Sequence, residues 1–429
     1  MITATPTSAI PNVSRPEGSQ RADIDLPATG DLTFCAAYLL AVTNTAKIWA
    51  VAQRELDKPE PPTSMPEYTL PGESRYQSTP ASFWTSGFFP GSLYLIYERQ
   101  RRWPSRTIQK PDIASLQRAC KWWTEALHEQ AHQKGTHDLG FLIQPWAQLA
   151  WELDEDVKSR DSLLVAARGL ADRFEERVGA IRSWDTCFTK RYAFADPSKD
   201  FLVIIDNLMN RRLAEIATEH ALTTLKSHVR ADNSTCHVVN FDQGTGEIKE
   251  RITNQGYSDE SCWSRGQAWG ITGFAQVYGW TKDPRFLAVS KRLADYFLRR
   301  LPQDGVPSWD FDAPGPNKPR DTSAAMVAAY GLILLAEADP LQSRKYLASA
   351  LRLVESVCRL SFSKPEARFV GVSPSGVPIS DVGGHDTILL NATINNYEFA
   401  PRRWADHGLV YADYYFLRIG NKLLEMGLL

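Results

Sequence analysis

Apolar residues recur at helical spacing along most of the chain, and this periodicity restricts the fold more than any other feature of the sequence. A repeat of three to four residues indicates a helix with one buried face, whereas a repeat of two indicates a strand. Ten segments have the helical repeat: 31–54, 91–100, 111–130, 138–153, 159–177, 264–280, 284–300, 321–336, 340–360 and 404–426. The sequence therefore predicts an all-α protein.

Strand-like sequence is confined to two short segments. Residues 236–252 predict a hairpin that turns at Gly244-Thr-Gly246, and residues 368–380 predict one that turns near Ser375-Gly376. Residues 201–230 have room for two further helices, which makes twelve. Twelve antiparallel helices can close into a double ring of six inner and six outer helices, although a helical solenoid is equally consistent with the count.

The 429 residues carry a net charge of -2 with both signs mixed, which gives no basic face for nucleic acid. The six cysteines contain no C-x-x-C pair and predict free thiols. The N-terminus lacks a basic start followed by an apolar core, and no uninterrupted apolar run is long enough to span a bilayer. We therefore expect a cytoplasmic protein without nucleic-acid or membrane partners. Residues 1–30, rich in Pro, Ser and Thr, are predicted to be disordered, and residues 31–429 to form a single domain.

One acidic residue, Asp206, ends the apolar run Phe201–Ile205. Burial disfavours the charged form of a carboxyl and raises its pKa, so Asp206 is a candidate proton donor near neutral pH. The alternative is a helix cap or a solvated turn.

A second acid, Asp138, precedes Leu-Gly-Phe at the start of an apolar helix. The helix dipole would keep this carboxyl ionised. Together, Asp138 and Asp206 would supply one charged and one protonated carboxyl for acid/base chemistry.

A competing pattern is His128-Glu-Gln-Ala-His132 followed by Gly135 and Asp138, which fits a zinc metalloprotease motif. Histidines at i and i+4 can share a zinc ion. Gln130 and Ala131 stand where such helices usually bury apolar bulk, so a protease is a remote alternative. A solvated helix end would explain the two histidines without a metal.

Aromatic residues make up 11% of the chain and include 13 Trp, which suits a site that stacks against sugar rings but also suits packing between large helices. Trp84 and Trp184 stand in aromatic loops. The block 255–269, preceded by His237, adds Gln255, Trp263, Arg265 and Trp269. These residues offer a stacking face, an amide and a guanidinium that could hold a carboxylate. Alternatively, Arg265 only forms a surface ion pair with Asp259 or Glu260.

Six motifs follow one another from about residue 80 to the end: WTSGFFPGSLYLIYE, HDLGF, IIDNLMN, the block 255–269, Pro319-Arg-Asp-Thr-Ser-Ala324 and GLVYADYYFL. In this order they resemble the unsaturated glucuronyl hydrolases, glycoside hydrolase family 88. The resemblance implies an (α/α)6 barrel, in agreement with the helix count, and it assigns Asp138 to a sugar site instead of a metal site. The hydrolases of unsaturated rhamnogalacturonan share this fold and are a second alternative.

The resemblance also implies hydration of a double bond instead of displacement at the anomeric carbon. The substrate would be an oligosaccharide made by a polysaccharide lyase, with a C4=C5 double bond in its non-reducing-end uronic acid, and no metal or cofactor would be needed. Asp206 matches the family's catalytic acid/base, which protonates C4 and activates the water that adds at C5. Asp138 matches the second essential aspartate. The matches to substrate contacts are His237, Gln255, Arg265 and Trp269, with Trp84, Trp184 and Trp263 as ring-stacking walls.

The sequence departs from the family between Asn210 and Arg211, where the family's pattern is longer. The inner helix that carries Asp206 should then have only about two turns, too few to be stable without strong packing. This departure favours one further alternative, a degenerate barrel that is inactive or only binds sugar.

Overall fold

The computed structural model describes residues 29–209, 214–373 and 378–429. Twelve α-helices lie within these ranges: α1 (Thr29–Leu39), α2 (Val42–Leu56), α3 (Phe88–Arg102), α4 (Ile113–Thr124), α5 (Leu139–Asp154), α6 (Val157–Ala171), α7 (Ala214–His228), α8 (Ser264–Thr281), α9 (Pro284–Arg300), α10 (Thr322–Ala338), α11 (Ser343–Ser361) and α12 (Val410–Glu425). The all-α prediction is confirmed.

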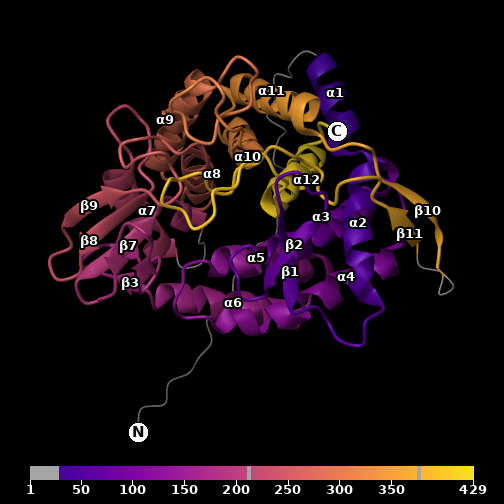
Figure 1. Cartoon of the computed structure of the whole chain (residues 1–429), viewed down its shortest axis with the longest axis horizontal. Helices are drawn as coiled ribbons and strands as arrows, with labels where there is room; N and C mark the ends of the chain where they lie inside the picture. Colours follow the sequence, from indigo (N-terminus) through magenta and orange to yellow (C-terminus); the bar gives the residue numbers. More distant parts are fainter. Residues whose placement is uncertain (1–28, 210–213, 374–377) are drawn as a thin grey trace, which may run out of the picture.

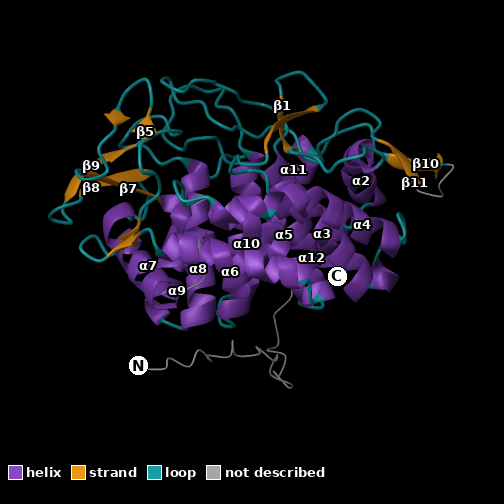
Figure 2. Cartoon of the chain, turned by 90° about the horizontal axis from the view of Figure 1, so that it is seen from below, coloured by secondary structure: helices purple, strands orange, loops and turns teal. Residues whose placement is uncertain are grey.

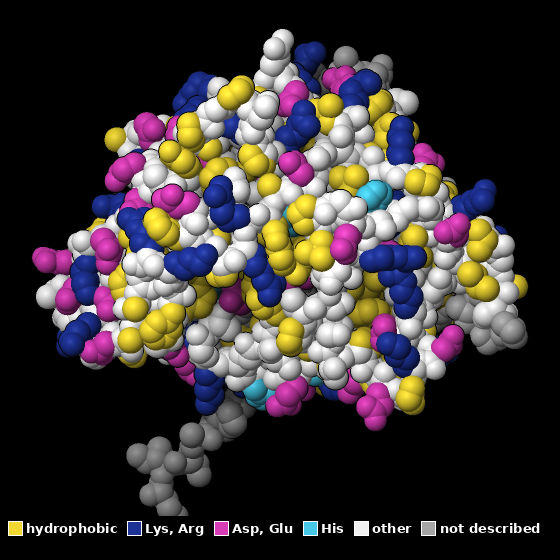
Figure 3. Space-filling view, viewed as in Figure 1, with side chains coloured by type: hydrophobic (Ala, Val, Ile, Leu, Met, Phe, Trp, Pro, Cys, Tyr) yellow, Lys and Arg dark blue, Asp and Glu magenta, His cyan; other side chains and the backbone are white. Residues whose placement is uncertain are grey.

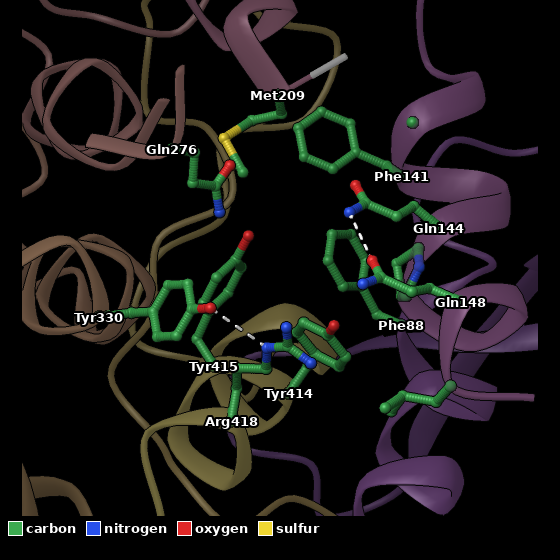
Figure 4. Close-up of a pocket in the computed structure, with 13 residues that line it drawn as sticks. Phe88, Phe141, Gln144, Gln148, Met209, Gln276, Tyr330, Tyr414, Tyr415 and Arg418 are labelled. Carbon is green, nitrogen blue, oxygen red and sulfur yellow. Dashed lines mark hydrogen bonds between the residues drawn. The ribbon is translucent and has the colours of Figure 1, made fainter. Parts of the chain in front are cut away.

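The helices α3, α5, α8, α10 and α12 surround the axis of the molecule, and the other helices lie outside them (Figure 1). A short 3-10 helix, η4 (Ile205–Met209), packs against α8 and completes this inner ring. A cavity on the axis, with about 30 Å³ for water-sized molecules, is lined by all six inner elements (Figure 4). They contribute Phe88 of α3, Gln144 of α5, Met209 of η4, Gln276 of α8, Tyr330 of α10 and Tyr415 of α12. The fold is therefore an (α/α)6 barrel, and the solenoid alternative is wrong.

The predicted helix 31–54 is two helices, because the helical conformation is interrupted between Leu39 and Val42. α1 packs against α11 and α12, whereas α2 packs against α3 and α4, so the two share one outer position. The stretch Asp31–Leu56 is long and apolar enough for a membrane span, but 61% of its most apolar window is buried inside the protein, as in a core helix.

The prediction of two helices within 201–230 is only partly correct, because the segment contains η4 and α7 but does not begin with a helix. Its first residues form β7 (Asp200–Ile204), which pairs antiparallel with β8 (Val238–Asp242). Phe201 and Val203 pack into one apolar cluster, and Leu202 and Ile204 into another. The apolar run is continuous because both faces of the strand are buried.

The two predicted hairpins are present, but strands are more widespread than predicted. β8 pairs with β9 (Ile248–Ile252), and β10 (Arg368–Val372) pairs with β11 (Pro378–Asp381). The unpredicted strands form three further hairpins: β1 (Ser64–Thr69) with β2 (Tyr76–Pro80), β3 (Phe174–Glu175) with β4 (Ala180–Ile181), and β5 (Cys187–Phe188) with β6 (Ala193–Phe194). Strands and long loops gather on one side of the helices (Figure 2).

Three predictions fall outside the described residues. They are the disorder of the N-terminal segment up to residue 28, the turn near Ser375-Gly376 and the shortened connection at Asn210 and Arg211. Thr29 already belongs to α1, so the predicted domain boundary at residue 31 lies within the first helix.

Candidate active site

The two predicted catalytic aspartates come from neighbouring inner elements. Asp138 directly precedes α5, and its side chain accepts a hydrogen bond from Thr136 Oγ1. Asp206 follows β7 in the first turn of η4 and is only 8% exposed. Its Oδ1 has no hydrogen-bond partner among the described residues. The end of a strand and the start of a helix thus bring both carboxyls to the loop side of the barrel.

Burial raises the pKa of Asp206 to about 6. The nearby charge of Asp138 adds to this increase, whereas His137 and Arg265 act against it. The direction is the one that the apolar run predicts. Asp206 is buried, so the alternative of a solvated turn is wrong.

His137 is a site residue that the sequence reasoning missed, although it stands next to Asp138. Its Nδ1 lies 3.2 Å from the carbonyl oxygen of Ser183, and its Nε2 lies 3.5 Å from Asp138 Oδ1. Trp184 packs edge-on against the His137 ring with centroids 5.4 Å apart. Trp184 is half-buried, as a wall of a sugar site would be.

His237 is held as a neutral hydrogen-bond donor. The backbone N–H of Asn254 donates to His237 Nδ1 (3.1 Å), so the ring proton must reside on Nε2. Burial, with a smaller contribution from Arg265, lowers the pKa of His237 to about 3. The ring packs against Trp263 with centroids 4.3 Å apart.

Arg265 is 1% exposed and forms an ion pair with the buried Asp321 (2.7 Å). Its Nη1 also donates to Ser323 Oγ (3.2 Å) and to the carbonyl of Thr393 (2.7 Å). The alternative of a surface pair with Asp259 or Glu260 is therefore wrong. The motif around Asp321 now has a role, since its carboxylate also accepts from backbone N–H groups at the start of α10.

Gln255 lies beside Arg265 because both donate to one carbonyl. Gln255 Nε2 is 3.0 Å and Arg265 Nη2 is 2.7 Å from the oxygen of Ile394. The amide and the guanidinium are thus brought together, as the sequence predicts.

Aromatic rings form the base of the site. Trp84 lies 5.5 Å from Phe141 and 5.2 Å from Tyr411, and Phe141 lies 5.2 Å from Trp269. Trp269 is only 1% exposed and belongs to the packed core below Trp84, which is half-buried. Tyr411, which the sequence reasoning did not single out within GLVYADYYFL, lies 5.4 Å from the Arg265 guanidinium.

Five buried polar atoms around Asp206 and Arg265 have no hydrogen-bond partner within the described part of the chain. They are Asp206 Oδ1, His137 Nε2, His237 Nε2, Trp263 Nε1 and Tyr411 OH. Buried polar atoms are nearly always paired with protein or water, so a cluster of unpaired ones indicates a place for a polar ligand. The arrangement offers a carboxyl with a raised pKa, a second carboxyl and several donors.

Comparisons with known proteins agree with this arrangement. No protein-family model matches the chain. It is 32% identical to the unsaturated glucuronyl hydrolase of Formosa agariphila over 79% of each chain. The chain belongs to the unsaturated glucuronyl hydrolases. It is also 30% identical to an unsaturated chondroitin disaccharide hydrolase of Streptococcus agalactiae, over 82% of this chain and 84% of that protein.

A solved unsaturated glucuronyl hydrolase specific for heparin has the same fold. It matches with a TM-score of 0.73 and 30% identity, over 91% of this chain and 98% of the other. This chain is therefore a glycoside hydrolase, and membership of the family favours an enzyme over the alternative of a degenerate barrel.

The metalloprotease alternative does not fit the structure of this hydrolase. His132 belongs to a 3-10 helix, η3 (Glu129–His132), so it does not share an α-helical face with His128. His128 Nδ1 instead lies 2.8 Å from Ser162 Oγ, and burial lowers the pKa of His128 to about 4. No group of three His, Cys, Asp or Glu in the described residues could hold a metal ion.

Proposed function

We propose that Asp206 is the general acid and base with which this hydrolase hydrates an unsaturated uronyl residue at the non-reducing end of an oligosaccharide. The observation that supports the role is the burial of Asp206 beside other buried polar atoms that have no hydrogen-bond partner among the described residues. A carboxyl with a pKa of about 6 can both give and take a proton near neutral pH.

In the proposed reaction, Asp206 transfers its proton to C4 of the C4=C5 double bond. The positive charge that develops at C5 is stabilised by the ring oxygen and by the carboxylate of Asp138. Asp206, now ionised, takes a proton from a water molecule whose oxygen bonds to C5. The hemiketal opens at the bond between C5 and the ring oxygen, and the hemiacetal left at C1 then releases the rest of the oligosaccharide. The spacing rule for retaining and inverting glycosidases does not apply, because no carboxylate attacks C1.

Substrate binding is assigned to the donors that surround this centre. His237 Nε2–H and Trp263 Nε1–H have no protein acceptor within the described residues and can donate to the uronate. Arg265 and Gln255 lie beside them, and the charge of Arg265 is balanced by Asp321. Trp84 and Trp184 are assigned to stacking on the sugar rings, since both are half-buried at the site. Trp269 supports the site from below.

The loop side of the barrel carries Lys and Arg mixed with Asp and Glu, without a broad patch of one sign (Figure 3). This mixed charge does not indicate one parent polysaccharide. The names of the relatives point to glycosaminoglycan disaccharides as the first substrates to test. The cytoplasmic location and a reaction without metal or cofactor stay predictions from the sequence.

The decisive experiment uses unsaturated disaccharides from chondroitin and heparin in deuterated water. We expect loss of the double-bond absorbance and one deuterium at C4 of the released uronyl product. In the proposed reaction the double bond is lost before the second sugar is released. Displacement at C1 would release the second sugar first, because the free unsaturated uronyl residue must then open and tautomerise, and this order would contradict the proposed chemistry. No turnover of any unsaturated disaccharide would contradict the function itself.

A further inference from the structure

The hairpin β5–β6 reaches across the loop side of the barrel to two distant segments. Its tip is Thr189–Tyr192, a tight turn in which the N–H of Thr189 donates to the carbonyl of Tyr192 (2.9 Å). Arg191 Nη1 donates to Asp259 Oδ1 (2.8 Å) and to Tyr397 OH (2.9 Å), and Arg191 Nη2 donates to Asp259 Oδ2. Tyr192 OH donates to the carbonyl of Thr253. The hairpin tip is thus fixed to the segment 253–259 from two side chains.

The ion pair with Arg191 continues directly into the candidate site. Asp259 Oδ1, which accepts from Arg191, also accepts from the backbone N–H of Thr253 (2.9 Å). Thr253 Oγ1 in turn lies 3.2 Å from His237 Nδ1. The next residue, Asn254, donates its N–H to the same nitrogen. Contacts that begin at Arg191 therefore end on the ring that presents Nε2–H to the site.

The same short segment carries Gln255, and its other side is held by residues before α12. Asn395 Nδ2 donates to the carbonyl of Asn254 (3.0 Å), and Gln255 Nε2 donates to the carbonyl of Ile394. Residues 253–255 are thus clamped between the hairpin tip and the segment 394–397. The loss of Arg191 removes one of the two side chains that hold the hairpin side of this clamp, and Tyr192 remains.

We propose that Arg191 is a positioning residue that sets His237 and Gln255 for the substrate carboxylate. The proposal rests on the proposed function of these two residues. Arg191 and Asp259 are 37% and 22% exposed, and an ion pair at that exposure contributes little to global stability. Its two parallel hydrogen bonds nevertheless fix the geometry of Asp259, and through it of Thr253. The effect of Arg191 is on substrate affinity instead of folding or proton transfer.

The test is the steady-state kinetics of Arg191→Gln on an unsaturated disaccharide. We expect KM to rise about threefold to tenfold while kcat stays within about twofold, because the bound substrate still meets Asp206. Arg191→Lys, which keeps one charged hydrogen bond, should recover part of the affinity. Asp259→Asn should raise KM as Arg191→Gln does, and the double variant should add nothing further.

A matched control is Arg285→Gln. Arg285 forms a comparable exposed pair with Asp283 at the start of α9, and it is 59% exposed. The KM of Arg285→Gln should equal that of the unchanged enzyme. An unchanged KM in Arg191→Gln or in Asp259→Asn, in an enzyme that is otherwise active, would overturn the role of Arg191 alone. An inactive unchanged enzyme would overturn the proposed function and this inference with it. If Arg191→Gln does not fold, Arg191→Lys and Asp259→Asn decide the question.

Discussion

Two neighbouring elements of the inner ring, α8 and η4, both carry proposed site residues, but they are held in different ways. α8 has 18 residues and presents Arg265 and Trp269 from its first two turns. η4 has five residues and presents Asp206. A helix as short as η4 has almost no stability of its own. The catalytic acid must therefore be fixed by its surroundings, whereas Arg265 is placed by a regular helix.

The surroundings of η4 supply several anchors. The N–H of Ile205 donates to the carbonyl of His237 (3.0 Å), which extends the pairing of β7 with β8 into the first residue of η4. Asn207 Nδ2 donates to the carbonyl of Ile181 (2.7 Å). Leu208 lies against Gly273 of α8. Every residue of η4 is buried, and this packing compensates for the low intrinsic stability of so short a helix. The prediction that a short inner helix needs strong packing agrees with these contacts.

The strongest test of η4 is the substitution Asp206→Asn. We expect kcat to fall by about 10²-fold or more, with little change in KM, because the amide cannot supply the proton for C4. Steady-state kinetics in buffered disaccharide measures both constants. Near wild-type turnover would remove Asp206 from the chemistry and leave α8 as the main contributor to the site.

The same substitution should also change the pH dependence of stability. The pKa of Asp206 is about 6 in the folded enzyme, above its ordinary value of about 3.9 when unfolded. Between these values the folded enzyme binds more protons, so its stability falls as pH rises through about 6. Asp206→Asn removes this titration and should be more stable than the unchanged enzyme by up to about 3 kcal/mol above pH 7, and equally stable below about pH 4.

Urea unfolding at several pH values measures this difference. A stability difference that does not vary with pH would show that Asp206 is not the group whose pKa is raised. The value of kcat/KM should also fall above about pH 6, because Asp206 must be protonated to act as the acid.

For α8, the corresponding test is Arg265→Lys. Lysine keeps the charge beside Asp321 but cannot reproduce the bonds to Ser323 and to the carbonyls of Thr393 and Ile394. In the proposed function Arg265 also gives a charge-assisted bond to the uronate. Losing that bond costs about 1.5 to 3 kcal/mol of binding free energy, so KM should rise roughly tenfold to a hundredfold with a smaller effect on kcat.

The control for Arg265→Lys is Arg320→Lys. Arg320 directly precedes Asp321 in the sequence and forms an exposed ion pair with Asp304. The control substitution should leave KM unchanged and cost less than about 1 kcal/mol. Equal, small effects of the two substitutions would mean that Arg265 only supports the fold.

The contrast between α8 and η4 also explains what could be predicted from the sequence. Helical spacing predicts α8 closely, because 264–280 has one continuous repeat. The run Phe201–Ile205 has no repeat, since both faces of β7 are buried, and a short apolar run cannot be told from a buried helix. The burial of Asp206 could still be inferred, because it depends only on the end of that run.

The partners of the site residues were harder to predict. The pair of Arg265 with Asp321 joins the start of α8 to the start of α10, and only the closed ring brings them together. Asp259 was considered as an ion-pair partner of Arg265 because the two are near in sequence. Asp259 instead pairs with Arg191, which lies in a hairpin that the strand pattern did not reveal. Which aspartate pairs with which arginine thus depends on tertiary contacts.

The smallest predicted effects test the interface between α8 and η4. A Cβ atom on Gly273 would lie 2.7 Å from the Cβ of Leu208, so Gly273→Ala must push η4 away from α8. Overpacking of this kind costs about 1 to 3 kcal/mol. Displacing Asp206 should also lower kcat by roughly tenfold, since proton transfer depends on its position.

The control position is Gly279, in the last turns of the same helix, where no atom lies within 4 Å of such a Cβ. Gly279→Ala should therefore leave kcat unchanged and stabilise the enzyme by about 0.5 to 1 kcal/mol, as alanine does inside helices. Thermal unfolding and kcat of both variants distinguish the two positions, and unchanged activity in Gly273→Ala would show that Asp206 does not depend on close packing of η4 against α8.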